Sequence, residues 1–153
     1  CNTDGSFINE ETLTTAGWVV RDSNETYRGT AQAIGIRVER ALESELQAIL
    51  MTLQHCWSLG YRKIIMETDC RTSKEILQDN KLQFPIYNWT RNIREWSKKF
   101  EAIEFQWINR RSNKVADKLA TSNPSRDPFL FHYYVPNNVT SFLREDYVLS
   151  HSN

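Results

Sequence analysis

Four acidic residues stand where carboxylates could do chemistry together: Asp4, Glu45, Asp69 and Asp117. Each lies on a different predicted element, two near the ends of strands and two on helices. Carboxylate oxygens are the ligands that Mg²⁺ prefers, and two such ions about 4 Å apart can stabilise the attacking and leaving oxygens of a phosphodiester. The set therefore predicts a site for two Mg²⁺ ions, with Mn²⁺ as the alternative, and hydrolysis of a nucleic-acid backbone.

The neighbours of these acids are small or polar rather than bulky. Gly5 and Ser6 follow the first acid and keep the space beside it open. Glu45 lies next to the apolar stripe of its helix with Ala48 beside it, and the last acid shares its helix face with Asn113. An acid of this kind taken alone is more often a solvated surface charge or a helix cap. The joint arrangement favours the shared metal site.

The helices and strands that would position the acids are predicted from the spacing of hydrophobic residues and from the Gly, Pro and polar residues that end each element. After a first strand that holds Asp4, these elements are strands at 15–20 and 26–36, a helix at 41–59, a strand at 63–68, helices at 72–79 and 86–100, a strand at 102–108, and a helix that Asn113 caps. This order predicts an α/β fold with a mixed five-stranded sheet, three antiparallel strands and then parallel strands, flanked by helices.

Residues 1–122 are predicted to form this domain, and residues 123–153 an extension rich in proline and aromatic side chains. We expect the extension to pack back over the edge of the sheet rather than to serve as a stacking platform for bases. Val139, Phe142 and Leu143 in this extension predict a short closing helix. Four tryptophans are expected in the core: Trp18, Trp89, Trp96 and Trp107.

Composition narrows the functional class. With 153 residues, 40% of them hydrophobic, the chain can bury one core, and no apolar run reaches the about 18 residues that a membrane span needs. Lys plus Arg and Asp plus Glu are both 19, so the basic excess common in nucleic-acid binders is missing. The three cysteines lack zinc spacing and favour a reducing compartment, nuclear or cytoplasmic. We expect a monomer without membrane association, trimmed before Cys1 so that any targeting segment lies outside it.

Five short motifs resemble the type 1 ribonuclease H family, most closely its plant reverse-transcriptase-like domains from retroelements. They are Asn-Thr-Asp-Gly-Ser at 2–6, Ala-Gly-Trp-Val-Val at 16–20, Glu-Leu-Gln-Ala at 45–48, Thr-Asp-Cys at 68–70 and Asn-Lys-Val-Ala-Asp-Lys-Leu-Ala at 113–120. The resemblance covers residues 1–122 and implies a ribonuclease H fold. It also implies an endonuclease that cuts the RNA strand of an RNA/DNA hybrid, with the four acids as metal ligands, and a place at the C-terminal part of a reverse transcriptase polyprotein.

The sequence also departs from many relatives. The loop before the last acid lacks their His and reads Asn-Arg-Arg-Ser at 109–112, so Arg110 or Arg111 is expected to contact phosphate instead. The interval between the last two acids is too short for a basic handle helix, and Ala41 and Leu42 replace Asn residues that read the RNA minor groove in several relatives. The residues predicted to contact nucleic acid are Gly5, Ser6, Arg71, Arg91, Arg94, Arg110, Arg111 and Asn113.

Two other functions stay open from the sequence. A domesticated retroelement domain, catalytically weak or silent, could bind nucleic acid or a protein through the same fold. A nuclease with another substrate could use the same four acids, because one fold and one acid layout serve many polynucleotide reactions. The basic residues of helix 86–100 are equally well explained as a solvated helix face.

Overall fold

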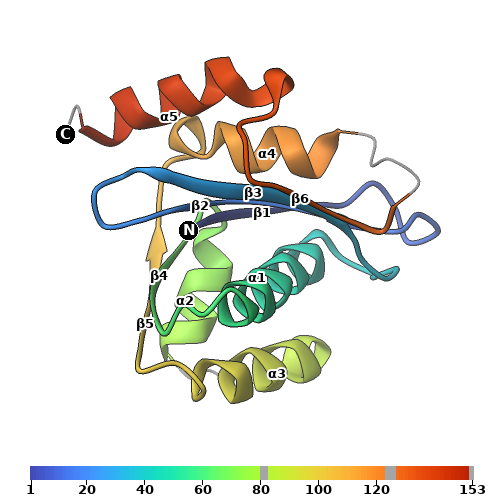
Figure 1. The fold of residues 1–153 in the computed structure, drawn as a ribbon. Coiled ribbons are helices and arrows are strands. Elements are labelled where there is room, and N and C mark those ends of the chain that lie inside the picture. The colour runs from blue at the N-terminus through green and yellow to red at the C-terminus, as the bar shows by residue number, and fades with distance from the viewer. Residues whose placement is uncertain (80–82, 123–126, 152–153) are drawn as a thin grey trace.

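The computed structural model describes residues 1–79, 83–122 and 127–151. One mixed sheet runs through the molecule in the order β5-β4-β1-β2-β3-β6 (Figure 1). Its strands are β1 (Asn2–Ser6), β2 (Thr15–Arg21), β3 (Tyr27–Ile34), β4 (Lys63–Thr68), β5 (Ala102–Trp107) and β6 (Phe129–His132). Strands β1, β2, β3 and β6 pair antiparallel, whereas β4 pairs parallel with both β1 and β5.

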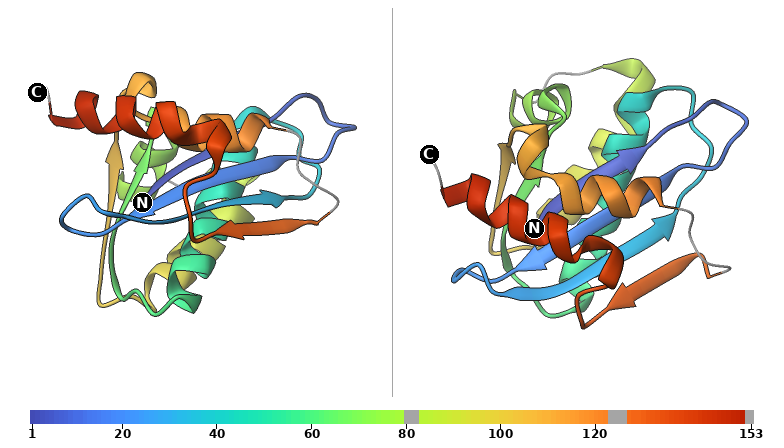
Figure 2. Two further views of the ribbon diagram at one scale, coloured as in Figure 1. Left: turned by 45° about the horizontal axis from the view of Figure 1, so that its top comes forward. Right: turned by 90° about the horizontal axis from the view of Figure 1, so that it is seen from above.

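Helices cover both faces of this sheet. The helices are α1 (Ala41–Ser58), α2 (Arg71–Asp79), α3 (Tyr87–Ser97), α4 (Lys114–Thr121) and α5 (Thr140–His151), with 3-10 turns η1 (Phe84–Ile86), η2 (Arg110–Ser112) and η3 (Asn137–Val139). Helix α1 packs on β1 and β2 with α3 outside it, and α4 packs on the opposite face with α5 beside it. Figure 2 shows α4 and α5 next to each other over the strands. None of the helices in the described ranges is long and apolar enough to cross a membrane.

Apolar side chains on both sides of β2 explain why helices pack on both faces of the sheet. Trp18 and its neighbours two positions away join the core under α1, which includes Leu46 and Ile49. Val19 points the other way and forms a second cluster with Val115 and Leu119 of α4. Successive side chains of a strand point to opposite faces, so an apolar run in a central strand requires a cover on each side.

The predicted α/β fold is confirmed, and the sheet has six strands instead of the predicted five. The sixth strand, β6, lies in the C-terminal extension and pairs with β3, with Ala31 opposite Phe131. The prediction missed it because four residues carry too little alternation to indicate a strand, and the pairing partner lies far away in sequence. In the described part of the extension, β6 lies at the edge of the sheet beside β3, and the chain continues into helix α5.

Candidate metal centre

Two of the four acids are brought together by the parallel pairing of β1 with β4. Thr3 lies opposite Thr68 in this register, so Asp4 and Asp69, the next residue on each strand path, are side by side. The carboxyl ends of parallel strands share one edge of a sheet, which is where such folds place their sites. Asp4 is 6% exposed, and the side chain of Asp69 is 10% exposed.

Helix α1 brings Glu45 to this pair. The backbone N–H of Gly5 donates to Glu45 Oε2 at 3.4 Å. A Cβ at Gly5 would lie 2.2 Å from the carbonyl oxygen of Ser44, so only glycine lets strand and helix approach this closely. One carboxylate oxygen from each of Asp4, Glu45 and Asp69 lies within 4.8 Å of the other two.

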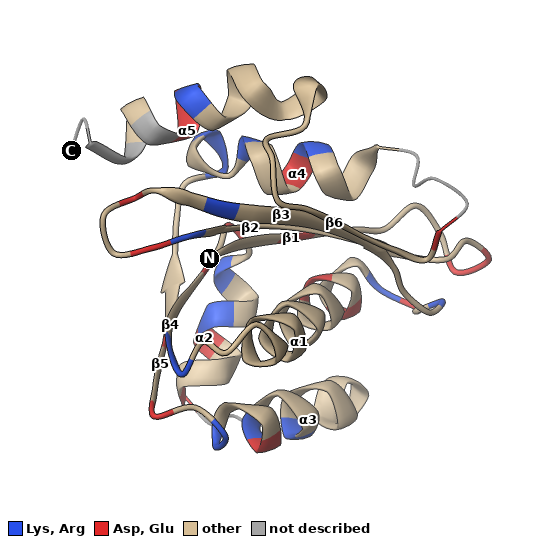
Figure 3. Cartoon of the chain, in the orientation of Figure 1, with Lys and Arg blue, Asp and Glu red and all other residues tan. Residues whose placement is uncertain are grey.

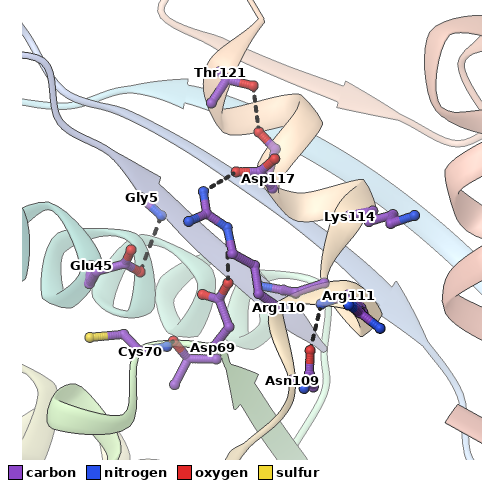
Figure 4. Close-up of polar contacts among 12 residues, drawn as sticks. Gly5, Glu45, Asp69, Cys70, Asn109, Arg110, Arg111, Lys114, Asp117 and Thr121 are labelled. Carbon is purple, nitrogen blue, oxygen red and sulfur yellow. Dashed lines mark hydrogen bonds and ion pairs between the residues drawn. The ribbon is translucent and has the colours of Figure 1, made fainter. Parts of the chain in front are cut away.

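Asp117 reaches the same space from the opposite helical layer. Its helix, α4, packs directly on β2, where a Cβ at Gly17 would lie 2.5 Å from the carbonyl oxygen of Ala116. Figure 4 shows Glu45, Asp69 and Asp117 approaching one another from three separate elements. The structure therefore brings together all four acids that the sequence singled out, three in mutual reach and Asp117 at the border of the same cleft.

The acids form a cluster of like charges that water only partly solvates. Burial, followed by the charges of Asp69 and Asp117, raises the pKa of Asp4 to about 7. Burial, followed by the charges of Asp4 and Asp69, raises the pKa of Glu45 well above its ordinary value. Burial also raises the pKa of Asp69. Such a site favours any cation that can enter it.

Arg110 lies at the mouth of the cluster. Its Nε is 3.9 Å from Asp69 Oδ2, and its Nη2 is 3.5 Å from Asp117 Oδ1 (Figure 4). The guanidinium thus spans two of the acids and lowers the pKa values of Asp4 and Glu45 against the stronger effect of burial. Its side chain is 79% exposed, so it can also swing toward solvent and a ligand.

The acids and Arg110 open into a cleft of about 780 Å³. Gly5 and Ser6, two of the residues predicted to contact nucleic acid, line this cleft. Ala41 and Leu42 also line the cleft, together with the hydroxyl-bearing residues Ser44, Thr72 and Thr121. Polar groups able to meet a sugar or a phosphate therefore surround the carboxylates.

Of the other arginines predicted to contact nucleic acid, three have exposed side chains and one is hydrogen-bonded within the protein. Arg71 is exposed, with its guanidinium carbon 4.5 Å from the centroid of the Trp107 ring. Arg91 and Arg111 are exposed, and Figure 4 shows Arg111 pointing away from the acids. Arg94 instead donates to the carbonyl oxygen of Ile76 at 3.3 Å, so it links α3 to α2 and is not free to bind phosphate.

Three sequence predictions near the site are wrong, two for Asn113 and one for Trp107. Asn113 is fully buried and its amide donates to the carbonyl oxygen of Thr3 at 3.0 Å, so it neither contacts nucleic acid nor caps α4 with its side chain. Trp107 is 39% exposed rather than in the core, while Trp18, Trp89 and Trp96 are buried or packed against the core. Trp107 ends an edge strand and its indole N–H donates to Asp69 O at 3.0 Å, which keeps the ring beside the cleft.

The donor set fits a divalent metal. Asp4, Glu45 and Asp69 offer hard oxygen ligands close enough for one cation, and Asp117 and Arg110 lie beside them. The raised pKa values show that the cluster without a cation is unfavourably charged, as expected where a cation supplies the missing charge. Positive and negative residues otherwise spread over both helical layers in the view of Figure 3.

Solved structures similar to this chain include three ribonucleases H. The RNase H1 of the halophilic archaeon Halobacterium salinarum NRC-1 is 18% identical with a TM-score of 0.72, over 78% of this chain and 91% of that protein. LC11-RNase H1 in complex with an RNA/DNA hybrid is 18% identical with a TM-score of 0.69, over 77% and 90%. The N-terminal RNase H domain of Rv2228c from Mycobacterium tuberculosis is also 18% identical, with a TM-score of 0.68 over 77% and 86%.

The chain therefore has a ribonuclease H fold. Its sequence matches the model of the reverse transcriptase-like family over residues 2–123, and the chain belongs to that family. No curated protein sequence matches it significantly.

Proposed function

We propose that this protein is a metal-dependent endonuclease that hydrolyses the RNA strand of RNA/DNA hybrids. The observation that carries the proposal is the meeting of Asp4, Glu45 and Asp69 within 4.8 Å, in a cleft that Asp117 also lines. Two supports come from the comparisons: the reverse transcriptase-like family, and a structure of the same fold that holds an RNA/DNA hybrid.

The four carboxylates would hold two divalent ions, Mg²⁺ or Mn²⁺. Such ions activate water and stabilise the charge on the attacking and leaving oxygens of a phosphodiester. The protein's own contribution is rigidity, because the acids come from two strand ends and two helices packed on the same strands. The acids would act as ligands, and the burial of Asp4 excludes most of the water that would otherwise screen its charge.

Arg110 would bind a phosphate of the substrate. In the structure it neutralises Asp69 and Asp117, and its exposed side chain has room to turn to the backbone of a nucleic acid. Arg71 on the N-terminal turn of α2 and the exposed Trp107 beneath it extend the contact surface beyond the cleft. Ala41 and Leu42 cannot donate side-chain hydrogen bonds, so hydroxyls such as Ser6 and Thr72 would recognise the ribose 2′-hydroxyl.

The substrate class is tested by incubating the protein and Mg²⁺ with a labelled hybrid, duplex RNA and single-stranded RNA, and mapping the product ends. We expect internal cuts confined to the RNA strand of the hybrid, with 5′-phosphate and 3′-hydroxyl ends. Asp69→Asn should abolish cleavage while the far-ultraviolet circular dichroism is unchanged. Glu95→Gln makes the same charge change on the exposed face of α3 and should cleave normally. Cleavage retained by Asp69→Asn would contradict the proposal.

A second candidate is a silent domain that binds nucleic acid without cutting it. The observation in its favour is Arg110, whose guanidinium pairs with two of the acids that would otherwise be metal ligands. A titration of hybrid affinity separates the candidates, because a pure binder should respond to salt and hardly to Mg²⁺. For either function we propose a monomer in the nucleus or cytoplasm, working as part of a reverse transcriptase polyprotein.

A further inference from the structure

Helix α4, which carries Asp117, begins without a cap of its own. The N-cap position holds Asn113, but no side-chain hydrogen bond caps the helix from there. The Asn113 amide instead donates a hydrogen bond to the carbonyl oxygen of Thr3, the residue before Asp4. The first backbone N–H groups of a helix have no partner within the helix, and leaving them buried without one is unfavourable.

A carboxylate from the far end of the chain supplies the missing cap. Asp146 of α5 accepts a hydrogen bond from the Lys114 N–H on Oδ1 at 3.1 Å and one from the Val115 N–H on Oδ2 at 3.0 Å. Asp146 is 2% exposed, so these bonds form where water does not compete. A negative charge at this position also interacts favourably with the helix dipole.

The capped first turn of α4 sets the position of Asp117. The Asp117 N–H donates to Asn113 O at 3.1 Å, the first hydrogen bond of the helix, so its side chain leaves α4 one turn after the cap. The same turn follows directly on η2, where Arg110 lies, and α5 packs against both η2 and α4. Figure 2 shows α5 running alongside α4 toward this end of the sheet.

The geometry points to Asp146 as a positioning residue for Asp117, which makes the C-terminal helix a part of the metal-binding unit. This inference rests on the proposed function and deepens it. Helix α5 lies outside residues 2–123, the part of the chain that the family model matches. Two buried hydrogen-bond contacts hold the first turn of α4: Asn113 ties it to β1, and Asp146 ties it to α5. Losing the second contact loosens Asp117 and leaves the other three acids in place.

The first test is backbone amide exchange in the metal-free protein. In Asp146→Ala we expect the amides of Lys114 and Val115 to exchange about tenfold faster or more, as for a helix that has lost its cap. Asp146→Asn, which keeps the shape and one acceptor, should give an intermediate rate. Glu145→Gln is the matched control, because the Glu145 carboxylate pairs with the partly exposed side chain of Lys114 and not with the backbone N–H groups that Asp146 caps.

The second test is Mn²⁺ affinity measured by calorimetry, together with hybrid cleavage at increasing Mg²⁺. We expect Asp146→Ala to weaken Mn²⁺ binding about tenfold and to raise the Mg²⁺ concentration for half-maximal cleavage similarly, with the KM for hybrid nearly unchanged. Asp146→Asn should show a smaller weakening in the same direction. All variants are compared at a temperature where each is fully folded.

A lower melting temperature with wild-type Mn²⁺ affinity would show that the cap only stabilises the fold, and would overturn the inference. Unchanged exchange at Lys114 and Val115 would overturn it as well. The proposed function fails separately, if the wild-type protein binds Mn²⁺ and leaves the hybrid intact. In that case exchange and Mn²⁺ affinity still decide whether Asp146 positions Asp117.

Discussion

Asp4 is held where its own charge is unfavourable. It is buried between β2 and β4 and beside two other acids, and its pKa is raised to about 7. A carboxyl whose pKa is raised by folding makes the folded state bind protons more readily than the unfolded state. The free energy of unfolding therefore falls as the pH rises from about 4 to about 7, and at neutral pH the charge of Asp4 destabilises the metal-free protein.

Asp4→Asn should consequently stabilise the metal-free protein at pH 7.5, by on the order of 1 to 4 kcal/mol. Urea unfolding with and without Mg²⁺ measures this change. Wild type should gain stability from Mg²⁺, because a ligand that binds only the folded state raises the free energy of unfolding, and the variant should gain much less. If Asp4→Asn destabilises the metal-free protein, the charge of Asp4 is not in conflict with its surroundings.

Arg110 pairs with two of the acids, and under the proposed function a phosphate of the substrate competes with them for its guanidinium. Arg110→Gln should tighten Mg²⁺ binding severalfold, because a positive charge beside the ligands is removed. The same change should weaken hybrid binding and lower the slope of log affinity against log salt by about one, as expected for one lost phosphate contact. Calorimetry with Mg²⁺ and fluorescence anisotropy of a labelled hybrid measure the two effects.

Arg111→Gln is the control for this prediction. It removes the same charge from the next residue, whose side chain points away from the acids in Figure 4. Its Mg²⁺ affinity should stay near the wild-type value. Equal effects of the two substitutions on Mg²⁺ binding would mean that general charge rather than the position of the guanidinium matters.

At this scale, residue types and their places on predicted elements are enough to select the four acids. They do not reveal the ion pairs of Arg110, because these depend on how η2 places a side chain between two elements. Nor do they reveal that Asn113 bonds to Thr3, since a partner 110 positions away leaves no local pattern. The local sequence predicts that the Asn113 side chain caps the helix. In the structure its amide donates instead to the buried carbonyl oxygen of Thr3, and a buried carbonyl group needs a donor.

Two glycines set the distances between elements, and each lies under one of the helices that carry an acid. Gly5 lets α1 approach β1, and Gly17 lets α4 approach β2. Close backbone approach is possible only without a Cβ, and here it brings Glu45 and Asp117 to the strand ends. The metal centre therefore depends on residues that carry no functional group.

Gly17→Ala should displace α4, because the new Cβ would lie 2.5 Å from both the carbonyl oxygen of Ala116 and the amide nitrogen of Ala120. Overpacking of this kind costs about 1 to 3 kcal/mol. We expect in addition a loss of cleavage of about tenfold at subsaturating Mg²⁺, partly restored at high Mg²⁺. Denaturant unfolding and metal titration of cleavage measure the two effects.

Gly60→Ala controls for simple destabilisation. Gly60 has a φ of 92° and nothing near its missing Cβ, so alanine there strains the backbone at the end of α1 without touching the site. It should cost about 1 kcal/mol and leave the Mg²⁺ dependence of cleavage as in wild type. An equal shift of Mg²⁺ dependence in both variants would show that the centre responds to stability alone.

The predicted elements agree with the structure where the signal is local. Helix α1 and strand β4 follow from hydrophobic period and from Gly60, and both end within one residue of the predicted limits. Strand β6 could not be predicted from the sequence, because it is defined by its pairing with β3 rather than by a local pattern. Trp18 shows the same dependence, since its indole N–H donates to His55 Nδ1, and both rings pack near Phe129 of that strand.

Across the whole molecule, buried titratable groups work in two opposing directions. Within the described ranges, burial raises the pKa values of five carboxyl groups: Asp4, Glu45, Glu67, Asp69 and Asp146. Each contributes a loss of stability as the pH rises through the range between its unfolded and folded pKa. Burial lowers the pKa of His55, which contributes a loss of stability as the pH falls below its unfolded pKa.

The five carboxyl groups outweigh His55, so the metal-free protein should be more stable at pH 5.5 than at pH 7.5, by roughly 1 to 2 kcal/mol. Saturating Mg²⁺ should reverse the order, because the metal requires deprotonated ligands and binds better at the higher pH. Urea unfolding at both pH values, with Mg²⁺ or with a chelator, measures the four free energies. Glu45→Gln should reduce both the pH effect and its reversal, whereas His55→Gln should enlarge the pH effect by removing an opposing group. Greater stability at pH 7.5 in chelator would mean that the acid cluster is not the dominant buried charge of the fold.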